Sequence, residues 1–461
     1  MNRPDWPAID RWLMGEAWTG SRARDHAVHL CDTIGPRWSG SDAEWEAIHF
    51  IRDQLTGAGL DDVQVEEFGL DTWNWSKAEA RLQPGDLSLQ ILPFIRCPSF
   101  AVEARVVDVG FGTPRAVEEK RSQLVGSVAV MSMAYEPFTT PEPHAYRLHR
   151  LALAGAVAAV VVDAKNGGRM EYHSSHDSRD PDLPQMPLPA VATSREHGDL
   201  LRRSATSVTL EVEALFSADA RTANVSACLR GTCWPDEHLL LGGHHDTVIC
   251  APGGNDNASG TIAVLETARV LAALRRDTGQ SPGRAIRFVT FSAEEQGFRG
   301  SFEYVERHYS DDGNRPRPRL AINLDELSAG HMKGLVLGFP HLRGLVQRQF
   351  DDMKDGLQCH IMSQIDGSSD HFPFLLRGID AGHLWRWRFR GRHPDSDYHH
   401  EAADTSDKLN VRELKEYAGQ LARLLLRLSW LPPEEWPENT ITPQQVQQRL
   451  SAERGSVVRI Y

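Results

Sequence analysis

Residues 239–248 read LLLGGHHDTV, an apolar run of strand length that ends in two glycines and passes into polar side chains. His244 and Asp246 lie two residues apart, so both face the same side where the strand ends. Asp246 can therefore orient His244 through a hydrogen bond. Parallel sheets of α/β proteins bind ligands at the carboxyl ends of their strands, so this stretch predicts such a sheet with a functional site at that edge.

Further acidic and histidine side chains follow the same pattern along the chain. A loop carboxylate, Asp256, precedes an apolar helical pattern at 262–274. Strand-like runs at 285–291 and 320–324 are each followed closely by carboxylates. We expect all of these groups to meet at one edge of the sheet. In chain order the set is His244, Asp246, Asp256, Glu294, Glu295, Asp325 and His400.

The charges in this set suit a pair of divalent cations. Asp256, Glu295, Asp325 and a bridging hydroxide together balance the charge of two Zn²⁺ ions. Two dications about 3.5–4 Å apart would otherwise repel strongly, and shared anionic ligands remove that repulsion. Imidazole and carboxylate ligands are both compatible with zinc.

Five segments in fixed order resemble the M28 family of zinc peptidases, whose members are largely aminopeptidases. The resemblance spans most of the chain outside one insertion. It implies two Zn²⁺ ions, or Mn²⁺ or Co²⁺ in their place, on a mixed, mostly parallel sheet flanked by helices. The segments are Gly242–Val248, Asn255–Gly260, Ser292–Gly297, Asn323–Asp325 and Tyr398–Thr405, with Ile34–Arg37, Gly40–Ser41 and Ser369–Phe374 as further matches.

The resemblance also implies a role for each residue. It makes His244 and Asp325 the terminal ligands of one zinc, Glu295 and His400 those of the other, and Asp256 the bridge. Glu294 becomes the general base, and Asp246 the partner of His244. A hydroxide held between the metals would attack the scissile carbonyl, while Glu294 would take a proton and pass it to the leaving amine.

Two of the expected ligands have a histidine neighbour, His245 or His399. We choose His244 because it lies two residues before Asp246, and His400 because it lies four before Asp404. The family often has threonine after the last histidine, whereas this chain has Glu401. We expect that difference to affect substrate contacts rather than metal binding.

The substrate is expected to be a peptide or an amino-acid derivative, and the enzyme an aminopeptidase. A carboxypeptidase or dipeptidase on the same scaffold is the first alternative, because arginines close to the last ligand would suit a terminal carboxylate. The complete ligand set argues against a single-zinc glutaminyl cyclase and against a binding relative that has lost catalysis. The candidate substrate contacts are Tyr398, Trp385, Arg386 and Arg388, although the alternation of aromatic and arginine residues there also fits a strand with one packed face.

The formal net charge of -13 argues against nucleic-acid binding. No segment approaches about 18 consecutive apolar residues, so we expect no membrane span. The N-terminus does not resemble a signal peptide, and the scattered cysteines are expected to be reduced, which makes the cytoplasm the expected location. A homo-oligomer is compatible with the sequence.

The order of the motifs predicts an inserted domain. We expect a catalytic domain at 1–81 and 217–461 and a smaller β-rich domain, similar to a protease-associated domain, at 82–216. Strand-like runs at 102–109, 126–131 and 157–162 and a helix at 144–153 support this division. The loop at 172–177 is expected to be solvated, with substrate contact as the alternative, and the tail beyond Leu431 is expected on the surface.

Overall fold

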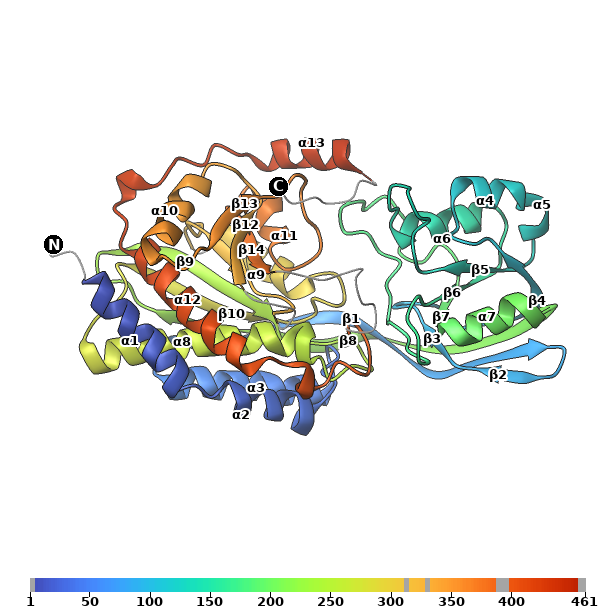
Figure 1. Cartoon of the computed structure of the whole chain (residues 1–461), viewed down its shortest axis with the longest axis horizontal. Helices are drawn as coiled ribbons and strands as arrows, with labels where there is room; N and C mark the ends of the chain where they lie inside the picture. Colours follow the sequence, from blue (N-terminus) through green and yellow to red (C-terminus); the bar gives the residue numbers. More distant parts are fainter. Residues whose placement is uncertain (1–4, 311–314, 328–331, 387–397, 455–461) are drawn as a thin grey trace.

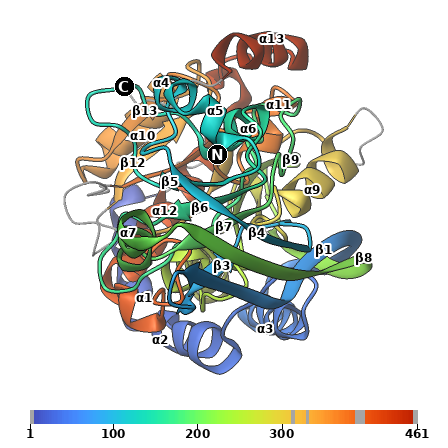
Figure 2. The same ribbon diagram turned by 90° about the vertical axis from the view of Figure 1, so that its right-hand side faces the viewer.

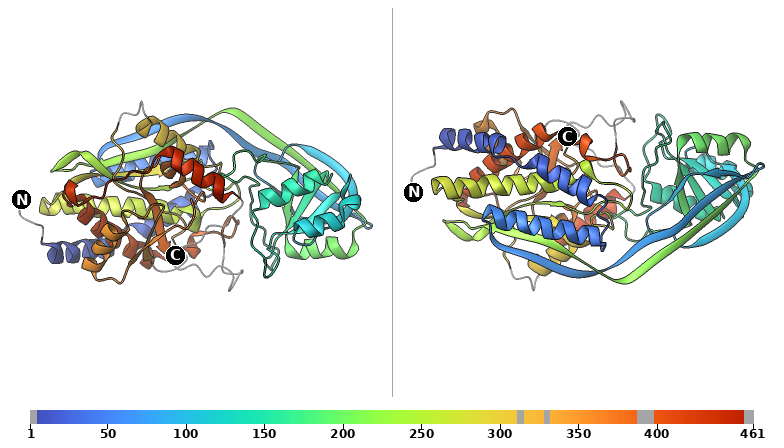
Figure 3. Two further views of the ribbon diagram at one scale, coloured as in Figure 1. Left: turned by 90° about the horizontal axis from the view of Figure 1, so that it is seen from above. Right: turned by 90° about the horizontal axis from the view of Figure 1, so that it is seen from below.

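The structure, a computed structural model, describes residues 5–310, 315–327, 332–386 and 398–454, with Trp385 and Arg386 described by their backbone alone. Two lobes of unequal size lie side by side (Figure 1). Two long strands, β1 (Asp61–Gln83) and β8 (Ser207–Leu229), pair antiparallel along their length and run from the larger lobe into the smaller one. Figure 3 shows this ribbon following the outside of the molecule between the lobes.

The sheet of the large lobe has the strand order β13-β12-β14-β11-β9-β10-β8. Strands β10, β9, β11 and β14 are mutually parallel, while β8 pairs antiparallel with β10 and β12 with β14. This confirms the mixed, mostly parallel sheet that the sequence predicts. The strands are β9 (Trp234–His244), β10 (Arg284–Phe291), β11 (Ala321–Asn323), β12 (Met332–Leu337), β13 (Gln358–Ile361) and β14 (Ala381–Arg386).

Helices cover both faces of this sheet. Adjacent residues of β9 point to opposite faces, so Leu239 and Leu241 enter one apolar core and Leu240 the other. Burial on both faces explains why the central strands are almost continuously apolar. One core includes side chains of α1 (Trp6–Thr19), α2 (Ala23–Ala27), the π-helix η1 (Val28–Ile34), α3 (Asp42–Ala58), α8 (Ser259–Thr278), α10 (Arg343–Met353) and α12 (Val411–Ser429). The other includes those of α9 (Arg299–Tyr309), α11 (Phe372–Leu376) and α13 (Pro443–Glu453).

The small lobe has its own layered arrangement, seen from its outer end in Figure 2. Its strands follow the order β8-β4-β5-β6-β7-β3, and β4 to β7 are parallel. One apolar cluster contains side chains of α4, α5 and α6, and another contains Leu201 of α7. The elements are β2 (Leu87–Leu89), β3 (Ile91–Pro93), β4 (Phe100–Asp108), α4 (Pro114–Glu119), α5 (Arg121–Leu124), β5 (Val128–Ser132), α6 (His144–Leu153), β6 (Ala158–Val162), β7 (Ala190–Thr193) and α7 (Arg195–Ser204).

Both expected boundaries of the insertion, 82 and 216, fall inside the continuous strands β1 and β8. The chain therefore passes between the lobes without a linker. The division into two domains and the kinship of the small lobe with protease-associated domains stay predictions. All six cysteines are free, as expected. Within the described residues, no helix is long and apolar enough to cross a membrane.

The C-terminal segment differs from the expected surface tail. It forms a short 3-10 helix, η5 (Pro433–Glu435), and then α13, whose Val446 and Leu450 are buried against the second core. Pro443 starts α13, and the side chains of Thr442 and Gln445 form a capping box with the backbone there. Proline begins this helix instead of breaking it, and the apolar pair four residues apart supplies its packed face.

Candidate metal centre

The expected ligands lie where neighbouring strands end. His244 is the last residue of β9, and the parallel pairing sets it opposite Phe291, the last residue of β10. Glu294 and Glu295 follow β10, and Asp325 follows β11, the neighbour of β9 on its other side. The three carboxyl ends therefore bring these side chains together, as the sheet pattern predicts.

His244 is fully buried and directs one ring nitrogen at the carboxylates. Its Nε2 lies 3.3 Å from Asp256 Oδ1, 3.5 Å from Asp325 Oδ1 and 3.9 Å from Glu294 Oε2. Its Nδ1 lies 3.1 Å from the backbone carbonyl oxygen of Asp246, which fits an Nδ1–H donor. That hydrogen bond leaves Nε2 as the lone-pair nitrogen that a metal would use.

His400 approaches the same aspartate from the other side. Its Nε2 lies 3.2 Å from Asp256 Oδ2 and 3.0 Å from Glu295 Oε2. Its Nδ1 lies 2.9 Å from the carbonyl oxygen of Tyr172, again leaving Nε2 for a cation. The two carboxylate oxygens of Asp256 thus face different histidines, which is the arrangement expected of a bridging ligand.

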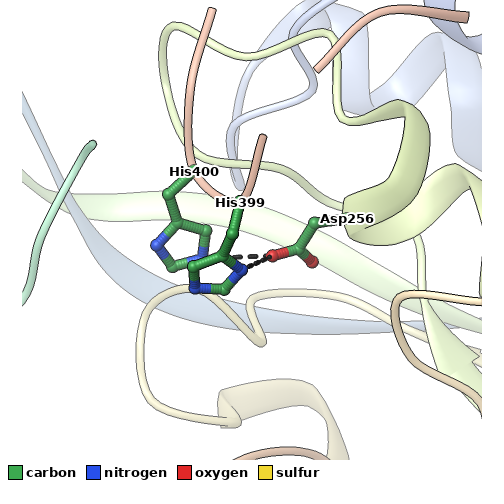
Figure 4. Close-up of side chains that lie close together, drawn as sticks. All are labelled: Asp256, His399 and His400. Atoms are coloured by element: carbon green, nitrogen blue, oxygen red, sulfur yellow. Dashed lines mark ion pairs between the residues drawn. The ribbon is translucent and has the colours of Figure 1, made fainter. Parts of the chain in front are cut away.

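The neighbouring histidines differ in their surroundings. His245 lies outside the cluster, because its Nδ1 contacts Thr290 Oγ1 at 3.1 Å and its Nε2 lies 3.6 Å from Glu44. His399 stacks on His400 with ring centroids 3.7 Å apart and also reaches Asp256, with Nδ1 3.1 Å from Oδ2 (Figure 4). Its second carboxylate contact is Glu326 at 3.1 Å, whereas that of His400 is Glu295.

Asp246 supports the centre mainly through backbone groups. Its Oδ1 accepts from the backbone N–H of Glu294 at 3.1 Å, and its Oδ2 accepts from that of Glu295 at 3.3 Å and from Ser39 Oγ at 2.8 Å. Its Oδ1 is also 3.4 Å from His244 Nδ1. The expected partner of His244 therefore also fixes the turn that carries the two glutamates.

Two other polar side chains hold the loops of the centre. Asp404 accepts hydrogen bonds from the backbone N–H groups of Asn255 at 2.8 Å and Asp256 at 2.9 Å. In the sequence, Asp404 served only in the choice of His400 as the ligand and was given no role of its own. These bonds hold the backbone of Asp256, whose φ of -115° and ψ of 93° are not helical, within the turn η2 (Gly254–Ala258). Arg37 is fully buried and its guanidinium donates to five backbone carbonyls, those of Leu30, Gly35, His245, Pro252 and Gly253.

The electrostatics of the cluster favour a cation. Burial disfavours a charged imidazole, yet the surrounding carboxylates raise the pKa values of His244 and His400 well above 6.5. Burial raises the pKa of Glu294 well above its ordinary value and that of Glu295 as well. Among the described residues, His244 Nε2 and Glu295 Oε1 are buried without a hydrogen-bond partner. Divalent cations would supply the missing positive charge and displace the protons, so the residues fit a metal centre.

The expected substrate contacts are placed only in part. The ring of Tyr398 lies 4.7 Å from the Arg169 guanidinium and 4.8 Å from Lys408 Nζ. Trp385 and Arg386 belong to β14, but their side chains lie outside the described residues, as does all of Arg388.

The sequence did not point to Glu326, and it matched Ser369–Phe374 to the family without giving those residues a role. Glu326, directly after Asp325, has a positive φ of 51° and accepts from Asn255 Nδ2 at 3.2 Å. In the segment 369–374, Ser369 accepts from Asn323 Nδ2 at 2.7 Å and Asp370 accepts from Ser301 at 2.5 Å. A second carboxylate beside a candidate ligand was the one available signal for Glu326.

Known proteins are similar to this chain in sequence and in fold. Residues 224–425 match the model of peptidase family M28. The chain is 27% identical over 424 residues to a probable leucine aminopeptidase 2 of Aspergillus oryzae, covering 84% of this chain and 80% of that one. It is 25% identical over 306 residues to carboxypeptidase Q of Bos taurus, covering 64% of this chain but only 63% of that protein. A zinc aminopeptidase from Bacillus subtilis superimposes with a TM-score of 0.70 at 21% identity, covering 91% and 97% of the two chains.

These similarities, together with the histidines and carboxylates at the carboxyl edge of the parallel sheet, identify the protein as a hydrolase of the peptidase type. The match over 224–425 agrees with the resemblance of its motifs to peptidase family M28.

Proposed function

We propose that this protein is a two-zinc exopeptidase that removes N-terminal residues from peptides. The observation that carries the proposal is the position of Asp256 between two histidines, with Oδ1 3.3 Å from His244 and Oδ2 3.2 Å from His400. His244 has Asp325 as its second acidic neighbour, and His400 has Glu295. Each half of the cluster thus offers an imidazole, a carboxylate of its own and a share of Asp256.

The ions, when bound, would supply Lewis acidity and a water of lowered pKa. Glu294 would act as the general base. Glu294 is 8% exposed, and burial raises the pKa of its carboxylate, so it is suited to hold a proton and release it to the leaving amine. Asp246 accepts a hydrogen bond from the backbone N–H of Glu294, which fixes the turn from which that carboxylate extends.

The choice of an aminopeptidase rests on the charge around the centre. A free α-amine is a cation and is attracted to a cluster of carboxylates. A carboxypeptidase needs a cationic group for the terminal carboxylate. Of the cations near the centre whose side chains the structure describes, Lys165 and Arg169 are both bound to Glu401, and Arg96 is bound to Asp71. The similarity to carboxypeptidase Q over 64% of the chain keeps the carboxypeptidase as the second candidate.

The test compares metal content and two kinds of substrate. The purified protein is expected to contain close to two zinc ions per chain, with Mn²⁺ or Co²⁺ as active replacements. It should cleave amino-acid anilides with a free N-terminus and show little action on N-acetylated peptides. Faster cleavage of N-acetylated peptides with a free carboxylate would replace the aminopeptidase with the carboxypeptidase. A folded protein without divalent metal would overturn both.

Two further features complete the proposal. The cytoplasm is the proposed location, which the six free cysteines support. The small lobe is the proposed counterpart of a protease-associated domain.

A further inference from the structure

One segment of the small lobe touches a proposed metal ligand directly. Residues 165–173, here called the docking loop, follow β6 and reach the segment that carries His400. The backbone N–H of Tyr172 donates to the carbonyl of His400 at 2.9 Å. In return His400 Nδ1 donates to the carbonyl of Tyr172 at 2.9 Å. The imidazole of the large lobe is thus oriented by the backbone of the small one.

Buried ion pairs join the same two segments one residue further on. Glu401 is only 2% exposed. Its Oε1 contacts Lys165 Nζ, and Arg169 binds both of its oxygens, with Nε 2.6 Å from Oε2 and Nη2 2.9 Å from Oε1. A bidentate guanidinium and an ammonium on one carboxylate form a strong and directional contact. Glu401 therefore binds the docking loop, which differs from the substrate contact that the sequence led us to expect.

The docking loop is itself held on the sheet of the small lobe. Asp163 is buried directly after β6, and its carboxylate accepts from the backbone N–H groups of Lys165 at 2.9 Å and Glu171 at 2.8 Å. At the other end of the loop, Tyr172 is 1% exposed and stacks on Trp75, with ring centroids 5.7 Å apart. Its apolar cluster also includes Trp73 of β1 and Val248 of the large lobe. The Tyr172 carbonyl is consequently fixed by both lobes.

We propose that Glu401, Lys165 and Arg169 are positioning residues for the metal centre, which hold the Tyr172 carbonyl against His400 Nδ1. This inference rests on the proposed function, because it takes His400 as a metal ligand. A hydrogen bond from the second ring nitrogen fixes the tautomer and the direction of Nε2, and loss of such a partner weakens metal binding by about 10–100-fold. Metal binding at the His400 half is therefore coupled to docking of the small lobe.

Two substitutions distinguish positioning from simple charge effects. Glu401→Gln removes a negative charge near the centre, and Lys165→Met removes a positive one. If these residues acted only through space, the first would weaken cation binding and the second would strengthen it. If they position His400, both substitutions weaken binding of one of the two ions, because each loosens the docking loop.

The measurement is the affinity for Zn²⁺, obtained for the metal-depleted full chain by titration against a competing chromophoric chelator. We expect about 10–100-fold weaker binding of one ion in both variants, with the other ion within about twofold of the parent. Asp71→Asn is the matched control. Asp71 joins Arg96 of the small lobe to Arg299 of the large lobe at 2.6 and 2.9 Å without contacting a proposed ligand. The Asp71→Asn variant should bind both Zn²⁺ ions with the affinities of the parent.

The outcomes separate this inference from the proposed function. If the parent protein binds no zinc, the proposed function itself is wrong. A parent that binds two ions, with both variants at parental affinity or with opposite shifts in the two variants, overturns the positioning role alone. Circular dichroism and melting temperature identify a variant that fails to fold. Arg169→Gln, which leaves the Lys165–Glu401 pair in place, then substitutes for it and is expected to weaken the same ion.

Discussion

The two histidines of the metal centre reach equivalent positions by different physical means. His244 ends a buried strand and has no exposed surface, and its Nδ1 partner is the carbonyl of Asp246, two residues away. His400 lies in a loop with a positive φ of 54°, and its Nδ1 partner is Tyr172, 228 residues away in the other lobe. Local sheet geometry therefore sets the first half of the centre, whereas packing between lobes sets the second.

The comparison predicts that the two halves respond differently to substitution. Substitution of a residue that both halves share should abolish metal binding at both halves. Substitutions in the second half should remove one ion and leave the other, because the strand that carries His244 does not depend on the small lobe.

The largest effect is expected from Asp256→Ala, which removes the group shared by both halves. Both ions should be lost at micromolar metal, together with peptidase activity, because each histidine faces one oxygen of this carboxylate. Elemental analysis after dialysis measures the loss. Glu66→Gln is the control. It removes another buried carboxylate, which contacts Ser226 and His308 and none of the proposed ligands, and the variant should keep both ions. If the Asp256→Ala variant retains two ions, Asp256 is not the bridging ligand.

Glu294→Gln should separate metal binding from chemistry. We expect both ions to remain, because the ring nitrogens and the other carboxylates are unchanged, while kcat falls by about 10²–10⁴-fold through loss of the general base. Steady-state kinetics on an aminoacyl anilide, with metal content measured on the same sample, checks this. Turnover equal to that of the parent would assign the proton transfer to another group.

Two substitutions, His400→Ala and His399→Ala, test which of these neighbouring histidines binds the ion of the second half. His400→Ala should lose one ion, since it removes the contacts with both Asp256 and Glu295. His399→Ala should keep two ions with affinity reduced less than in His400→Ala, because its second contact is Glu326. Titration of the metal-depleted proteins with Zn²⁺ gives the stoichiometry. The reverse order of effects would exchange the roles of these neighbours.

The smallest effect on the centre is expected from Leu450→Ala in α13. Leu450 is 5% exposed and packs in the second core, so the free energy of unfolding should fall by about 2–5 kcal/mol. Zinc stoichiometry and kcat should stay at parental values at temperatures below the transition. Denaturant unfolding measures this change in the free energy of unfolding. Gln448 is an exposed residue of the same helix, and Gln448→Ala should change the free energy of unfolding by less than about 0.5 kcal/mol. A parental free energy of unfolding for Leu450→Ala would show that α13 does not pack.

Periodicity was sufficient for the sheet and for much of the centre. The strand expected at 285–291 is β10 (Arg284–Phe291), and the helix expected at 144–153 is α6 (His144–Leu153). Carboxylates just past the ends of β10 and β11 meet because parallel strands share one carboxyl edge. The length of β1 (Asp61–Gln83) follows from its pairing with β8, a contact that neither segment shows by itself.

The sequence by itself determined the mixed sheet, the resemblance to peptidase family M28 and the ordered set of histidines and carboxylates, because these depend on local periodicity and on spacing along the chain. Only the tertiary structure decided that His245 turns to Thr290, that Asp404 holds the backbone of Asp256, and that Tyr172 meets His400. Those contacts join segments far apart in the chain. The partner of each group depends on how the sheet and the two lobes pack, which no local pattern records.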